Sequence, residues 1–290
     1  MNRIAVTLTC VILQLCAPAC ERDRPQPAPA VAMKPAAERP APKPKPKPKF
    51  WPEPGSPLKP PALSFPEGFG QPRVFLDAGH GNAGNAGAES CLCEDEQDIN
   101  LALVKHMAPI LKDTQHFHLK LSRDATSVSG DLGRLADAAK FHAGAIVSIH
   151  ADVRGEGRRW SPSANKTCWR NDSAPGFSVL FADAGPRDLV DARRRLARTI
   201  ASALLKTGFL PYGGEDYEDL YEGDAQQPGV FMDRHVPGER ILFLRGTRIP
   251  SVIIETHHAW DLRETKRFAQ PATRDAFAQA VAAGLQDFFR

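Results

Sequence analysis

A strong net charge is absent from this 290-residue sequence, in which 37 basic and 34 acidic side chains leave a formal charge of +3. The sequence also has no basic stripe with interleaved aromatic residues, which is the pattern typical of a nucleic-acid-binding surface. We therefore expect no nucleic-acid partner. Internal repeats are absent as well, and no apolar run beyond residue 15 is long enough to span a membrane as a helix. Neither a repeat array nor an integral membrane domain is expected.

The first 20 residues have the composition of an export signal. Arg3 supplies a positive start, and residues 4–15 form an uncharged apolar run that is too short to cross a membrane as a mature helix. A buried N-terminal helix is the alternative, but no foldable segment follows it. Two kinds of processing remain open: plain cleavage near Ala19, or lipoprotein processing that leaves Cys20 as a lipid-bearing membrane anchor. In both cases we expect the protein to leave the cytoplasm.

Residues 21–69 are rich in Pro, Lys and Ala and lack a sustained apolar period. Alternating Pro and Lys favours the extended polyproline II conformation, in which about 40 residues reach on the order of 100 Å. We therefore predict a disordered linker that tethers the rest of the chain. The remaining residues, 70–290, are numerous enough to form one sizeable domain.

Cysteine is scarce in the part that is expected to fold. Three of the six cysteines lie in the export signal, which leaves Cys91, Cys93 and Cys168. Cys168 can pair with either of the other two, and the sequence does not choose between them. A metal site at Cys91 and Cys93 is a further alternative, although zinc sites more often have two residues between their cysteines.

Residues 70–290 alternate between short apolar strands and amphipathic helices. This alternation predicts an α/β fold: a single three-layer domain with a mostly parallel or mixed sheet of about six strands and helices on both faces. The expected strands are 74–77, 118–121, 145–150, 177–181, 241–244 and 252–254, and the expected helices are 96–112, 131–141, 187–205 and 273–289.

Four polar side chains stand where these elements end or begin. His80 follows the first strand, His150 ends the strand at 145–150, and Glu255 follows the strand at 252–254. Glu96 opens the first helix on the same face as Ile99, which directs it inward. Because ligands of open α/β sheets bind beyond the carboxyl ends of the strands, we expect these four groups to converge.

Two histidines and one carboxylate are a common ligand set for catalytic zinc, with a fourth position left for water. We therefore predict a zinc site at His80, Glu96 and His150, with Glu255 as the carboxylate that takes and returns the proton of the water. Taken singly, each histidine could instead be a core residue and each glutamate a surface residue. Glu94 is a rival to Glu96 as a ligand.

Around these residues, four segments resemble one known family. They are VFLDAGHG at 74–81, EQDINLA at 96–102, IVSIHAD at 146–152 and PSVIIET at 250–256. From residue 73 to the C-terminus the chain resembles the zinc-dependent N-acetylmuramoyl-L-alanine amidases of the amidase-3 type. The resemblance implies that His80, Glu96 and His150 hold Zn2+ and that Glu255 is catalytic. The implied reaction is hydrolysis of the amide between N-acetylmuramic acid and L-alanine in peptidoglycan.

Smaller features both support and qualify the resemblance. Arg123, in Ser-Arg-Asp, and Arg134 stand where the family usually has arginine. Ala78 replaces the usual Pro, Asp152 replaces the usual Asn, and Ala139 stands where Asn is common. These departures put in question the groups that support the ligands, but not the ligands themselves.

Three other segments are expected near the site. Segments 84–95 and 154–175 carry the three cysteines and should rim it, where a disulfide would hold the rim together. His257 and His258 either bind substrate or are ordinary polar residues at a strand end. The acidic segment 215–226 is either a solvated loop or a cover of the kind that a protein activator removes in some members of the family.

The implied partners are peptidoglycan, a protein activator and, through Cys20, a membrane. The implied location is outside the cytoplasm. The protein is either periplasmic or is itself an outer-membrane lipoprotein that faces the cell wall. Two alternative functions remain: a wall-binding or regulatory module without turnover, and a zinc peptidase or deacetylase that acts on another amide.

Overall fold

The computed structural model describes residues 52–53, 55–124, 129–217 and 219–290. The predicted export signal, Cys20 and most of the predicted linker lie outside these residues. Within them, no helix is both long enough and apolar enough to cross a membrane.

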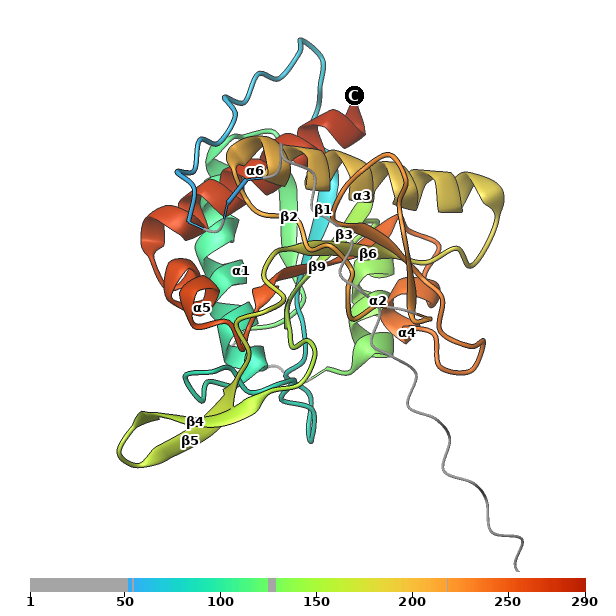
Figure 1. The fold of residues 1–290 in the computed structure, drawn as a ribbon. Coiled ribbons are helices and arrows are strands. Elements are labelled where there is room, and N and C mark those ends of the chain that lie inside the picture. The colour runs from blue at the N-terminus through green and yellow to red at the C-terminus, as the bar shows by residue number, and fades with distance from the viewer. Residues whose placement is uncertain (1–51, 54, 125–128, 218) are drawn as a thin grey trace, which may run out of the picture. The chain divides into compact units, whose positions relative to one another are not determined.

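A mixed seven-stranded sheet forms the centre of the domain, in the order β2-β1-β3-β9-β6-β8-β7 (Figure 1). Strands β2, β1, β3 and β9 are parallel, whereas β6 runs antiparallel to β9 and β7 antiparallel to β8. This confirms the predicted α/β class and the mixed sheet. The strands are β1 (Arg73–Ala78), β2 (His118–Leu121), β3 (Ala145–Asp152), β6 (Ser178–Phe181), β7 (Tyr221–Gly223), β8 (Val230–Asp233) and β9 (Ser251–His258).

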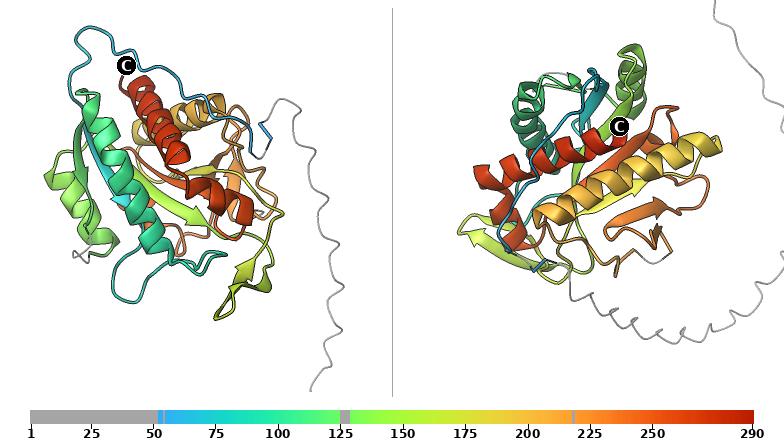
Figure 2. Two further views of the ribbon diagram at one scale, coloured as in Figure 1. Left: turned by 90° about the vertical axis from the view of Figure 1, so that its left-hand side faces the viewer. Right: turned by 90° about the horizontal axis from the view of Figure 1, so that it is seen from above.

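Helices cover both faces of the sheet, so the central strands β1, β3 and β9 are buried along most of their length and largely apolar. Val74 of β1 faces a core that contains Met107 and Phe277. Its neighbour Phe75 faces the opposite core, together with Leu135. Figure 2 shows β1 between α1 and α2. The first face carries α1 (Glu96–Asp113), α3 (Arg187–Thr207) and α6 (Pro271–Phe289), and the second carries α2 (Asp131–Lys140) and α4 (Leu242–Arg245).

Several elements differ from the sequence prediction. The predicted strand at 241–244 is wrong, because these residues form the short helix α4, in which neighbouring Phe243 and Leu244 are both buried. A short apolar run does not by itself distinguish a buried strand from a helix. Strands β7 and β8, helix α5 (Leu262–Phe268) and a hairpin of β4 (Arg158–Ser163) and β5 (Lys166–Arg170) were not predicted. The hairpin extends away from the sheet in Figure 1.

Residues 55–69, which the sequence analysis assigns to the linker, lie along the domain as an extended strap. Four of its apolar side chains pack against the core on the α6 side. Lys59 N donates to Thr207 O at 2.8 Å, and Ser64 N donates to Gln286 Oε1 at 3.0 Å. The packed part of the chain therefore begins before residue 70. Its apolar residues alternate irregularly with proline, which hides them from a periodicity analysis. They are Leu58, Leu63, Phe65 and Phe69.

Removing the strap should weaken the domain. We expect a chain truncated before residue 70 to lose about 2–4 kcal/mol of unfolding free energy relative to a chain truncated before residue 52, because four partly buried apolar side chains are lost. Urea unfolding of both chains measures the difference. Equal midpoints and slopes for the two truncations would contradict the packing role of the strap.

Candidate metal centre

His80, Glu96 and His150 lie together at the carboxyl ends of β1 and β3. One ligand atom from each side chain lies within 4.8 Å of the other two. His80 Nε2 is 3.0 Å from Glu96 Oε2, and His150 Nδ1 is 3.0 Å from Glu96 Oε1. The two imidazole rings meet nearly edge to face, with centroids 4.7 Å apart. The structure thus brings the three predicted ligands to one point.

The turn after β1 sets the position of His80. His80 itself has a φ of 61° and Gly81 a φ of 87°, so the chain reverses sharply at the end of the strand. His80 Nδ1–H donates to Asn85 Oδ1 at 2.8 Å. This hydrogen bond orients the ring so that Nε2 faces Glu96.

Glu96 is the first residue of α1 and is almost fully buried, with an exposed fraction of 5%. Its Oε2 accepts a hydrogen bond from Ala88 N at 2.9 Å, and its Oε1 accepts bonds from Ala151 N at 3.2 Å and Asn100 Nδ2 at 3.3 Å. These donors orient both carboxylate oxygens, one toward each histidine. The position at the N-terminus of a helix also favours a negative charge.

The electrostatics of the cluster keep the carboxylate ionised. Burial alone would raise the pKa of Glu96, but the hydrogen bonds to His150 and His80 outweigh it and hold this pKa well below the usual carboxyl range. Burial lowers the pKa of His80, and its interactions with Glu96 more than offset this, so the net shift is upward. A buried anion that faces two imidazole nitrogens is an environment suited to a divalent cation.

The space around the three side chains also fits a metal site. Gly79 lies against His150, and a Cβ atom on Gly79 would overlap the imidazole ring. Gly87 lies against Glu96 and His80, where a Cβ atom would come within 2.7 Å of His80 Cδ2. Two glycines therefore leave the room that the ligands occupy. The nitrogen and oxygen donors match the set that zinc prefers in catalytic sites.

Glu255 lies beside this cluster on the neighbouring strand. Its position in β9 pairs in register with His150 of β3, so the two side chains project from the same face of the sheet. Burial raises the pKa of Glu255 well above the usual carboxyl value, and the nearby charges of Asp152 and Glu96 raise it further. Its Oε2 is buried and has no hydrogen-bond partner among the described residues. The carboxyl group is thus free to bond a molecule in the site.

Two of the departures from the family pattern have a clear physical basis. Ala78 N–H donates to Ser122 Oγ at 3.1 Å, a bond that proline at this position could not make. Asp152 Oδ2 accepts from Arg154 Nε at 2.9 Å and also from the hydroxyl of Tyr217. Arg154 is itself buried, so a charged aspartate at position 152 compensates its charge where asparagine would not.

Arginines hold the turn that carries His80. Arg123 donates to the carbonyl oxygens of Ala78 and Gly79 at 3.0 and 3.1 Å. Arg134 Nη1 pairs with buried Asp77 at 3.1 Å and also donates to Ala78 O. Arg134 Nη1 also donates to the backbone oxygen of His80 at 3.5 Å, so both arginines stabilise the end of β1 through backbone oxygens. Nothing in the structure explains why Ala139, the third departure, stands where the family commonly has Asn.

The remaining polar candidates lie away from the three ligands. Glu94 is exposed and is not part of the cluster. His257 stacks on Phe268 with ring centroids 4.5 Å apart, and it lines a cavity of about 480 Å³ beside α1. Burial lowers the pKa of His257 to about 3 and that of His258 to about 4, so both rings are neutral.

A disulfide ties the two rim segments together. Cys93 pairs with Cys168 across a Cα–Cα distance of 5.5 Å, while Cys91 remains a buried free thiol. The sequence left the pairing open between Cys91 and Cys93. Since the sulfur of Cys93 is in a disulfide, it offers no thiolate for the alternative Cys-x-Cys metal site.

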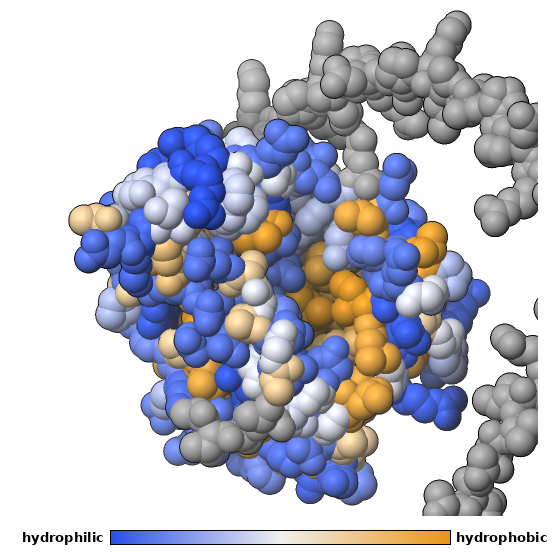
Figure 3. All heavy atoms as spheres, turned by 90° about the horizontal axis from the view of Figure 1, so that it is seen from below, coloured by the Kyte–Doolittle hydropathy of each residue, from blue (hydrophilic) through white to orange (hydrophobic). Residues whose placement is uncertain are grey.

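Figure 3 shows the molecule from below, the side toward which the loops that follow β1 point in Figure 1. This face is hollowed near its centre, and hydrophobic residues line the hollow while hydrophilic residues surround it. A concave surface of mixed polarity is typical of a substrate-binding face.

Comparison with known proteins gives a consistent result. A family model described as N-acetylmuramoyl-L-alanine amidase matches residues 74–287. The N-acetylmuramoyl-L-alanine amidase AmiC of Escherichia coli O6:H1 is 24% identical over 256 residues, which cover 79% of this chain and 57% of AmiC. The probable N-acetylmuramoyl-L-alanine amidase AmiB of Haemophilus influenzae is 24% identical over 230 residues, which cover 74% and 51%. The chain thus spans about half the length of these curated relatives.

A solved structure shares the fold. The N-acetylmuramyl-L-alanine amidase Ami1 from Mycobacterium smegmatis superposes with a TM-score of 0.59 at 20% identity, over 76% of this chain and 98% of Ami1. The similarity extends over nearly the whole of Ami1, so it covers the sheet and both helical layers.

Substituting Gly79 tests the geometry of the centre. We expect Gly79→Ala to lower zinc affinity at least tenfold, because the added methyl group displaces the ring of His150 and the loss of ligand support costs about 10- to 100-fold. Competition with a chromogenic chelator measures the affinity. Gly238→Ala is the matched control, since a Cβ atom there meets nothing within 4 Å. Equal zinc affinity in both variants would contradict the assigned ligand geometry.

Proposed function

This chain belongs to the N-acetylmuramoyl-L-alanine amidase family, and we propose that it hydrolyses the amide bond between N-acetylmuramic acid and L-alanine in peptidoglycan. The observation that carries the proposal is the convergence of His80, Glu96 and His150, with Glu255 beside them on the next strand. A structural or wall-binding role alone would not require an ionised buried carboxylate between two imidazoles.

His80, Glu96 and His150 are the residues that would hold Zn2+. When bound, zinc polarises the carbonyl of a scissile amide and lowers the pKa of a coordinated water to about 7. The protein's own contribution is to hold the donors in place. Asn85 orients His80, and the backbone of Ala88 orients Glu96. These contacts fix the donor atoms before a substrate arrives.

Glu255 is the proton carrier in this proposal. Burial raises the pKa of Glu255, which makes its carboxylate a stronger base toward water, and the protonated carboxyl can then return the proton to the leaving nitrogen. Its unpartnered Oε2 is available for that proton. The leaving nitrogen is the amine of L-alanine, and the muramic acid retains the lactyl carboxylate.

The proposed substrate and the disulfide both support a location outside the cytoplasm. Peptidoglycan lies outside the inner membrane, and a disulfide such as Cys93–Cys168 persists mainly in oxidising compartments. We propose that residues 1–20 direct export and that the protein works in the periplasm. Lipidation of Cys20 would add a membrane anchor, from which the Pro/Lys-rich linker lets the domain reach the wall.

The acidic segment 215–226 is better suited to a supporting role than to that of a removable cover. It contains β7, which pairs with β8 at the sheet edge. It also contains Tyr217, which is buried and donates to Asp152 near Glu255. Displacing the segment would break these contacts beside the site. A protein activator remains a prediction.

The central test is the substitution Glu255→Gln. Glutamine keeps the size of the side chain but cannot carry the proton, so we expect release of stem peptides from purified sacculi to fall by about 10²- to 10⁴-fold. Zinc content should remain at the level of the unsubstituted protein, because Glu255 is not one of the ligands.

Three results would argue against this assignment. Loss of zinc together with activity would make Glu255 a ligand. Shortened peptides in place of intact stem peptides, identified by mass spectrometry, would indicate a peptidase. No product from the unsubstituted, zinc-loaded protein would leave the wall-binding alternative.

A further inference from the structure

The β4–β5 hairpin, residues 158–170, has two different faces. Its antiparallel register places Arg159 opposite Trp169, and Trp160 opposite Cys168. Because side chains alternate across a strand, Arg159 and Trp169 share one face while Trp160 and Cys168 share the other. We call these the outer face and the inner face.

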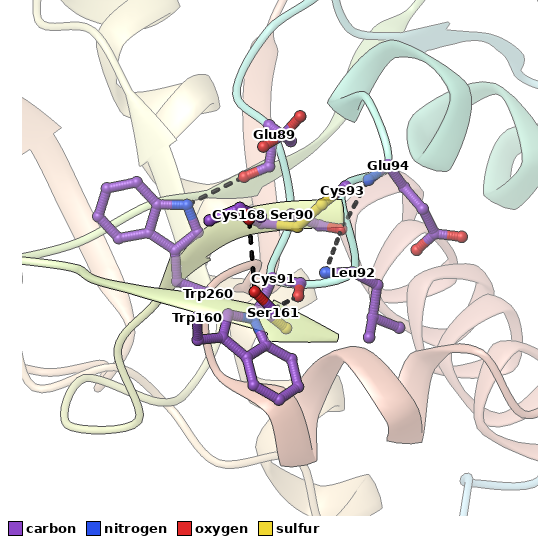
Figure 4. The surroundings of a disulfide bond; sticks show 11 residues. Glu89, Ser90, Cys91, Leu92, Cys93, Glu94, Trp160, Ser161, Cys168 and Trp260 are labelled. Atoms are coloured by element: carbon purple, nitrogen blue, oxygen red, sulfur yellow. Dashed lines mark hydrogen bonds between the residues drawn. A yellow bond between two sulfur atoms is a disulfide. The ribbon is translucent and has the colours of Figure 1, made fainter. Parts of the chain in front are cut away.

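The inner face is fastened to the loop that leads into α1. Trp160 Nε1–H donates to Cys91 O at 2.7 Å, and the disulfide joins Cys168 to Cys93. Figure 4 shows the indoles of Trp160 and Trp260 turned toward the 89–94 loop. Arg170 packs over the ring of Trp160 at 5.0 Å. The inner face therefore anchors the hairpin to this loop.

The outer face presents aromatic surface to solvent. Trp169 has an exposed fraction of 39%, which places it among the few large apolar side chains exposed in the described part of the chain. Trp260, from the loop after β9, lies next to it with ring centroids 6.1 Å apart and a tilt of 33°. Gly157 leaves room for the ring of Trp260, since a Cβ atom there would come within 2.8 Å of Trp260 Cζ3. The two indoles form one ledge.

This ledge is connected directly to the metal centre. Trp260 Nε1–H donates to Glu89 O at 2.9 Å. The adjacent residue, Ala88, donates its N–H to Glu96 Oε2 and accepts the N–H of Glu96 at 2.8 Å. A molecule that rests on the ledge is thus positioned by the same loop that orients a ligand.

The composition of the hairpin favours a sugar over a membrane or a protein interface. Residues 158–170 contain no Leu, Ile, Val, Met or Phe, and no Asp or Glu. Flat indole faces pack against the C–H faces of pyranose rings, and guanidinium groups donate to hydroxyl and acetamido oxygens. On the outer face, the guanidinium of Arg159 lies over the ring of Trp169, 5.0 Å from the ring centroid. Its positive charge therefore stands beside the exposed indole, where it can attract the carboxylates of neighbouring stem peptides.

We propose that the outer face of the hairpin, through Trp169 and Trp260, binds sugar rings of the glycan strand next to the muramic acid that is cleaved. This inference rests on the proposed function and adds a second contact to it. The ledge would hold the polymer so that one lactyl amide reaches the metal centre.

Binding without turnover tests the inference. In the full chain with Glu255→Gln, we expect the further change Trp169→Ala to lower affinity for purified sacculi about tenfold in co-sedimentation, as loss of an exposed aromatic anchor does. Trp169→Phe should restore most of the binding, and Val236→Ala, an exposed apolar residue outside the hairpin, should leave it unchanged. A soluble oligosaccharide of β-1,4-linked N-acetylglucosamine should compete with sacculi for binding to the chain that carries only Glu255→Gln.

Unchanged sacculus binding of the Trp169→Ala variant, with its melting temperature and zinc content preserved, would overturn the inference. Competition by purified stem peptides but not by the oligosaccharide would also overturn it, because the occupant would then be a peptide. The assay needs no hydrolysis, so its outcome is independent of whether the unsubstituted enzyme releases stem peptides.

Discussion

The buried carboxylate of Glu96 is the constraint on which the rest of the site depends. An anion with an exposed fraction of only 5% is stable in the folded protein only when partners compensate its charge and bond its oxygens. Here two imidazoles and three backbone or amide donors do so. The segments that supply these partners must therefore meet around Glu96. This requirement ties the end of β1, the middle of the 79–95 loop and the end of β3 to one point.

The sheet topology makes this convergence possible. Because β1, β3 and β9 are adjacent and parallel, residues that follow the three strands emerge at one edge. Glu255 arrives beside His150 by register alone. The buried pair of Asp77 and Arg134 then fixes the end of β1 on the face of the sheet that carries α2. Fold and site are thus joined through backbone register as well as through side-chain contacts.

Much of this arrangement follows from local sequence signals. Apolar strands that end in Gly-His-Gly, in histidine and in glutamate indicate where His80, His150 and Glu255 lie, and the helix that begins at Glu96 adds the fourth group. Other features depend on contacts between distant segments. The α4 segment reads equally well as a strand, the polar hairpin has no apolar period, and the partner of Cys168 depends on which cysteine faces β5.

The region 154–175 also influences the surroundings of the candidate metal centre. It brings buried Arg154 next to Asp152, where Arg154 also donates to the carbonyl oxygens of Ala174 and Gly176. A buried guanidinium requires an anion, which accounts for an aspartate where the family usually has asparagine. That aspartate in turn raises the pKa of Glu255, while Arg154 lowers it. The segment that builds the hairpin therefore also adjusts the charge balance around Glu255, so the rim and the candidate metal centre are parts of one electrostatic system.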